Sequence, residues 1–83
     1  MASARRLSEL GVDIPLAKEL AAQIDANTGN MRRLIELGMV PDLAKEVAAN
    51  ITAGAANNRR LVAFSMPPNV VVEVAQQIAD AQP

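Results

Sequence analysis

Residues 32–51 read RRLIELGMVPDLAKEVAANI, and the same pattern occurs 27 residues earlier and 27 residues later. The chain consists of three copies of one unit, residues 3–29, 30–56 and 57–83, which align without a gap after Met1 and Ala2. A fixed repeat of this length is typical of architectures in which one unit is too small to bury its apolar face alone. We therefore expect residues 1–83 to form a single domain in which the units pack on one another.

Six positions carry the same residue in every unit. They are Arg5, Arg32 and Arg59; Arg6, Arg33 and Arg60; Leu7, Leu34 and Leu61; Glu19, Glu46 and Glu73; Ala21, Ala48 and Ala75; and Ile24, Ile51 and Ile78. The third unit differs most, because Ala63, Ser65 and Val72 stand where the first two units share glutamate, glycine and lysine. If one unit is specialised for a partner, this difference points to the third.

The first half of each unit predicts a short helix. Each opens with a residue whose side-chain oxygen can accept from the free amides of a first helical turn: Ser3, Asn30 or Asn57. The expected helices cover residues 4–10, 31–37 and 58–64. In the first two units the next residue is Gly11 or Gly38, which suits the left-handed conformation that follows many helix ends.

The second half predicts a longer amphipathic helix. A proline marks its first turn, where the missing amide hydrogen costs nothing. Leu16, Leu20 and Ile24 then follow at the spacing of one helix face. The valines at 70–72 have high β propensity, but the repeat places them on this helix. The prediction is an all-α fold of three helical hairpins and six short helices.

Two arrangements fit three equivalent hairpins: a short open stack, or a compact rosette around a pseudo-threefold axis. The sequence favours the rosette slightly, because an open stack usually needs modified end repeats. Roughly four aliphatic side chains per unit make a thin core, whose burial is nearly offset by the cost of ordering the backbone. We therefore expect the free chain to be only marginally stable. We also expect association, either with a partner protein or as a homo-oligomer, to increase its stability.

The composition argues against an enzyme. The chain has no cysteine and no histidine, and its one aromatic residue is Phe64. Thiolate and imidazole chemistry and the metal sites they build are thereby excluded, and we expect no catalytic residue, cofactor, metal or small-molecule substrate. A net charge of −1 gives the chain no overall attraction to nucleic acid, so we expect nucleic-acid binding less than a structural role or an adaptor role. No signal-peptide run or membrane-length apolar stretch is present, so we expect neither export nor membrane insertion.

The paired arginines have two interpretations. In one they are solvated or bonded within their helix, since Glu9 follows Arg5 by four residues and Glu36 follows Arg32 likewise. In the other, one arginine of each pair binds a carboxylate of its own unit, a neighbouring unit or a partner. The third unit favours the second interpretation, because it keeps both arginines although Ala63 replaces the glutamate. The expected carboxylates are Glu19, Glu46 and Glu73.

Apolar residues at the turn and on the third unit are the other candidates for function. The turn residues, Val12, Met39 and Met66 with Leu10, Leu37 and Phe64, either plug the hairpin or present a protein-binding spot. Val70, Val71 and Val72 make one helix apolar on more than one face, which requires cover from the other units or from another chain. The candidate partner-binding residues are Arg5, Arg6, Arg32, Arg33, Arg59, Arg60, Met39, Phe64, Met66, Val70, Val71 and Val72. The candidate structural residues are Glu19, Glu46, Glu73, Gly11 and Gly38.

The pattern of residues 32–51, present in all three units, resembles a short repeat of small virion-associated proteins of tailed bacteriophages. The resemblance implies a head-decoration, cement or fibre-attachment protein, made in the host cytoplasm and located in the virion, whose partners are capsid or other virion subunits. A second resemblance is to ubiquitin-associated domains, whose first two helices flank a Met-Gly-aromatic turn. Here the turn reads Leu37-Gly38-Met39 without an aromatic residue, which argues against ubiquitin binding. The alternative to a virion protein is a small soluble adaptor that binds one partner protein.

Overall fold

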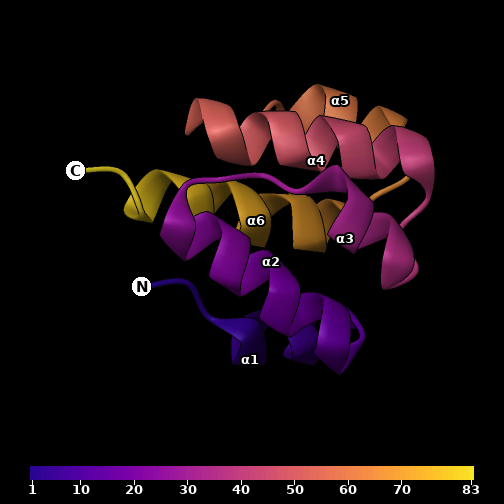
Figure 1. Cartoon of the computed structure of the whole chain (residues 1–83), viewed down its shortest axis with the longest axis horizontal. Coiled ribbons are helices and arrows are strands. Elements are labelled where there is room, and N and C mark those ends of the chain that lie inside the picture. Colours follow the sequence, from indigo (N-terminus) through magenta and orange to yellow (C-terminus); the bar gives the residue numbers. More distant parts are fainter.

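A computed structural model describes the whole chain, residues 1–83, and confirms the all-α prediction (Figure 1). The six helices are α1 (Ala4–Glu9), α2 (Ile14–Ala26), α3 (Met31–Glu36), α4 (Pro41–Ala53), α5 (Asn58–Ala63) and α6 (Pro68–Asp80). Each unit thus pairs a six-residue helix with a thirteen-residue helix. None of the helices has the length and apolar character needed to cross a bilayer.

The predicted caps of the short helices are confirmed. Ser3 accepts a hydrogen bond from the amide of Arg6, and Asn30 and Asn57 accept the equivalent bonds at 3.1–3.2 Å. The short helices end one residue earlier than predicted, because Leu10 and its equivalents already leave helical geometry. The turn then has a positive φ in every unit, at Gly11 (103°), Gly38 (107°) and also Ser65 (76°). The third unit therefore keeps the turn without its glycine.

The hairpins close into a ring. Within each unit the short helix packs on the long one, and between units α2 packs on α3, α4 on α5, and α6 on α1. The last contact joins the first and third units, so the two chain termini lie on the same side of the molecule (Figure 1). The result is the closed rosette, with overall dimensions of 29 × 23 × 22 Å.

The core repeats with the sequence. Each short helix buries one leucine completely, and each long helix buries three apolar residues at equivalent positions. These residues are Leu7, Leu34 and Leu61; Ala17, Ala44 and Val71; Leu20, Val47 and Val74; and Ile24, Ile51 and Ile78. Burial of the same positions in every unit explains why leucine and isoleucine are identical in all three.

Two backbones approach closely at Ala48, on the long helix α4. A side chain at Gly29 would overlap the backbone carbonyl group of Ala48. The amide of Gly29 also donates a hydrogen bond to Thr52 Oγ1, at 2.9 Å. The connection between the first and second units therefore lies directly on the backbone of α4, which requires a residue without a side chain at position 29.

Candidate functional site

A buried amide side chain joins each unit to the next. Gln23, on α2, accepts a hydrogen bond from the amide of Asn30 at 2.8 Å and donates to the Asn30 carbonyl at 3.2 Å. The same Nε2 group donates to Glu19, one turn earlier on α2, at 2.9 Å. This arrangement gives hydrogen-bond partners to the backbone amide and carbonyl at the start of the next hairpin. It also orients the Glu19 side chain towards that hairpin.

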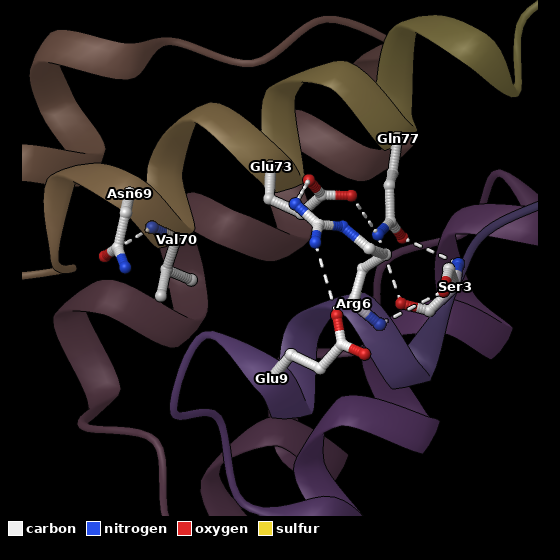
Figure 2. Close-up of polar contacts among 7 residues, drawn as sticks. All are labelled: Ser3, Arg6, Glu9, Asn69, Val70, Glu73 and Gln77. Atoms are coloured by element: carbon white, nitrogen blue, oxygen red, sulfur yellow. Dashed lines mark hydrogen bonds and ion pairs between the residues drawn. The ribbon is translucent and has the colours of Figure 1, made fainter.

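The other two interfaces repeat this arrangement with small changes. Between the third and first units, Gln77 accepts from the amide of Ser3 at 3.0 Å and donates to its carbonyl at 3.1 Å, although the two residues are 74 positions apart (Figure 2). Between the second and third units, the shorter Asn50 accepts from the amide of Asn57 at 2.6 Å. The ring is thus closed by the same contact that joins units linked by the chain.

Each oriented glutamate pairs with the second arginine of the following unit. The distances are 3.5 Å for Arg6–Glu73, 3.6 Å for Arg33–Glu19 and 2.9 Å for Arg60–Glu46. The predicted pairing of Arg5 with Glu9 and of Arg32 with Glu36, four residues apart, is wrong. The local partner is the second arginine at a spacing of three, as in Arg6–Glu9 at 3.2 Å, because that arginine faces the interface (Figure 2).

The six candidate arginines therefore divide into two sets. Arg6, Arg33 and Arg60 take part in the contacts between units. Arg5, Arg32 and Arg59 are exposed and form no ion pair within the chain. The side chains of this second set form no hydrogen bond or ion pair with the rest of the chain.

The shortest of the ion pairs between units, Arg60–Glu46, predicts a pH dependence of stability. The hydrogen bond from Arg60, followed by that from Asn50, holds the pKa of Glu46 below its usual value of 4.5. A carboxyl whose pKa is lowered on folding adds stability above its unfolded pKa and loses that contribution as pH falls through the folded one. We expect Glu46→Gln to lower the free energy of unfolding at pH 7. The difference in this free energy between the variant and the parent chain should shrink steadily below pH 4.5.

Urea denaturation at pH 7 and at about pH 3 measures this difference. Glu36→Gln is the matched control, because Glu36 bonds only within its own short helix and its side chain is half exposed. A difference between the parent chain and Glu46→Gln that is the same at both pH values would contradict the role given to the ion pair.

An apolar pocket lies where the three turns meet. Equivalent residues of all three units line it, so it surrounds the pseudo-threefold axis, and its volume is about 340 Å³. The lining includes the turn residues Val12, Met39 and Met66, the residues before them, Leu10 and Phe64, and the first core-facing residues of the long helices, Leu16, Leu43 and Val70. We refer to it as the axial pocket. Val40, which lies at its rim, is 56% exposed.

The structure corrects several of the proposed surface residues. Met39, Met66 and Val70 are buried, and contribute to the wall of the axial pocket rather than to an exposed spot. Val71 is buried as well, because it occupies the core position of Ala17 and Ala44. The valines at 70–72 therefore do not form one docking face; Val72 alone is exposed.

Phe64 is half-buried and lines the axial pocket. The Arg60 guanidinium lies 5.0 Å from the centre of its ring, which favours this position of the aromatic side chain. The residues that distinguish the third unit thus lie in three separate places: Phe64 in the pocket wall, Val71 in the core and Val72 on the surface.

Several lining residues of the pocket were not predicted. The helical spacing predicts that Leu16 and its equivalent Leu43 belong to the helix core. The position of Asp13 and Val40 carries a different residue type in each unit, so the repeat gives no signal there. The amides Gln23, Asn50 and Gln77 were also missed, although an amide at the same position of every unit was a usable signal.

Few polar side chains line the axial pocket. Asp13 is the one charged residue in its lining, and no group of three acidic side chains is arranged to hold a metal ion. The chain matches no protein-family model, and no curated protein or solved structure is significantly similar to it.

Proposed function

We propose that the protein is a non-enzymatic structural module that binds another protein through the end of the ring that carries the axial pocket. The observation that supports this proposal is the pocket itself, an apolar cavity of about 340 Å³ built from equivalent residues of three units and open to solvent. An apolar concavity with an exposed apolar rim is a common mark of a binding site.

A protein side chain suits this pocket better than a small molecule does. Pockets for small molecules usually measure about 300–1,000 Å³ and orient their ligands with several placed polar groups. The axial pocket is at the lower limit of this range, and Asp13 and Ser65 provide its only polar side chains. An aliphatic side chain of a bound protein is oriented by the backbone to which it is attached, so it does not need polar groups in the pocket. We therefore propose that the partner protein inserts an aliphatic side chain.

The partner is, in the most specific form of the proposal, a subunit of a phage particle. This part rests on the resemblance of residues 32–51 to repeats of virion-associated proteins, which implies a decoration, cement or attachment role in the virion. A ring of three similar units also suits a threefold position of a protein shell. The alternative is an adaptor with one partner, and the copy number of the partner distinguishes the two.

Placing a charge at the pocket rim should abolish binding. Val40→Lys puts an ammonium group where the partner's apolar group must pass, at a site exposed enough for the fold to tolerate it. We expect at least a tenfold loss of partner recovered with tagged protein from producing cells, measured by quantitative mass spectrometry.

Val72→Lys is the matched control for this experiment. Val72 is 63% exposed, is the same residue type and lies outside the lining of the pocket. Equal recovery of the partner by the two variants would contradict the proposed docking site. If the recovered partner is the repeating subunit of a particle, the lattice role is supported, whereas a single-copy partner supports the adaptor.

A further inference from the structure

We infer that the partner segment that fills the axial pocket carries a lysine or arginine within a residue or two of its apolar side chain. This inference rests on the proposed docking function and names the chemistry of its partner. The observation is a wide groove between the first and second units, which shares Gly11, Val12, Asp13 and Gly38 with the pocket. An occupant of the pocket therefore extends naturally into the groove.

The charged residues that line this groove are all acidic. They are Glu9, Asp13 and Glu36, and no lysine or arginine lines either the groove or the pocket. Asp13 is exposed, forms no ion pair and makes no capping bond with the start of α2. Its carboxylate is therefore available to a partner.

The two glutamates of the groove are only partly neutralised. Arg6 lies between Glu9, at 3.2 Å, and Glu73, at 3.5 Å, so one positive charge serves two carboxylates (Figure 2). The second unit repeats this arrangement with Arg33, Glu36 and Glu19, at 2.9 and 3.6 Å. Each set of one arginine and two glutamates keeps a net negative charge. Together with Asp13, these sets give the groove a negative potential.

This potential is confined to one side of the axis. In the third unit Ala63 replaces the glutamate and Pro67 replaces Asp13, so Arg60 there pairs with one glutamate only. On that side Phe64 lies beneath the Arg60 guanidinium. The apolar pocket has pseudo-threefold symmetry but the charge around it does not, and a segment with an adjacent cation would bind in a single orientation.

Short peptides test this inference directly on the intact chain. The probes are the acetylated hexapeptide amides Ser-Gly-Leu-Lys-Gly-Ser and Ser-Gly-Leu-Glu-Gly-Ser, titrated into methyl-labelled protein and followed by NMR. We expect both to shift the methyl resonances of Leu16 and Leu43, and the lysine peptide to bind about three to ten times more tightly, as exposed charge pairs allow. The preference should fall at about 0.5 M salt.

Variants separate the two proposals. Changing Glu9, Asp13 and Glu36 together to their amides (E9Q, D13N, E36Q) should make the two peptides bind equally, whereas Asp80→Asn, outside both cavities, should preserve the preference. Equal binding of the two peptides to the parent chain would overturn the inference about the cation and leave the docking function intact. If neither leucine peptide shifts the pocket methyl resonances, both proposals fail.

Discussion

Replacing Leu34 with alanine will lower the free energy of unfolding by about 2–5 kcal/mol. Leu34 is completely buried, and the truncation removes apolar contact area and leaves a cavity among side chains that pack tightly. A domain of this size has a stability of about 5–10 kcal/mol, so the loss is a large share of the total. Equilibrium denaturation in urea measures it.

The repeat provides matched comparisons for this variant. Leu7→Ala and Leu61→Ala should cost similar amounts, because the three leucines are equivalent and equally buried. Ile35→Ala, at the next residue of the same helix, should lower the free energy of unfolding much less than Leu34→Ala, because Ile35 is 36% exposed. An equal loss at Leu34 and Ile35 would show that the described core is wrong.

Replacing Gln77 with alanine will destabilise the ring at the one interface that no chain connection spans. The substitution removes two bonds to Ser3 and one to Glu73. At about 1 kcal/mol for each bond, the expected loss is about 3 kcal/mol. Because α1 and α6 meet only through this interface, amide hydrogen exchange should accelerate first in α1.

The control for this variant is the preceding residue. Gln76 is also a glutamine on α6, but it is exposed and bonds only to Asp80, so Gln76→Ala should be nearly neutral. Gln23→Ala removes the equivalent bonds where the chain already joins the units, and should leave the exchange of α1 unchanged. Unchanged exchange in the Gln77 variant would contradict closure of the ring by this contact.

The sequence predicted those parts of the fold that depend on local chemistry. The caps at Ser3, Asn30 and Asn57, the turn glycines and the helical periodicity each act within one unit. The caps and the periodicity occur in all three units, and the glycine in the first two. Closure of the ring was only favoured from the sequence. Closure depends on the contact between Gln77 and Ser3. These residues are far apart in the sequence, and the helical periodicity does not encode contacts of this kind.

The candidate site was harder to predict because tertiary packing decides which apolar residues face solvent. Val70 and Val71 are buried and Val72 is exposed, although the three are adjacent and identical. Their place at the turns predicts exposure for Met39 and Met66, but both are buried in the closed ring. The axial pocket exists only after three turns converge, so no single unit indicates it.

Photo-cross-linking at the pocket rim tests the central claim most directly. A photoreactive phenylalanine analogue replaces Val40 in one variant and Val72 in another, and both are irradiated in cells that produce the protein and its partners. The proposed docking site predicts a cross-link from position 40 to one protein, at an aliphatic residue next to a lysine or arginine, and none to that protein from position 72. Cross-links to the same protein at equal yield from both positions, or only from position 72, would contradict it.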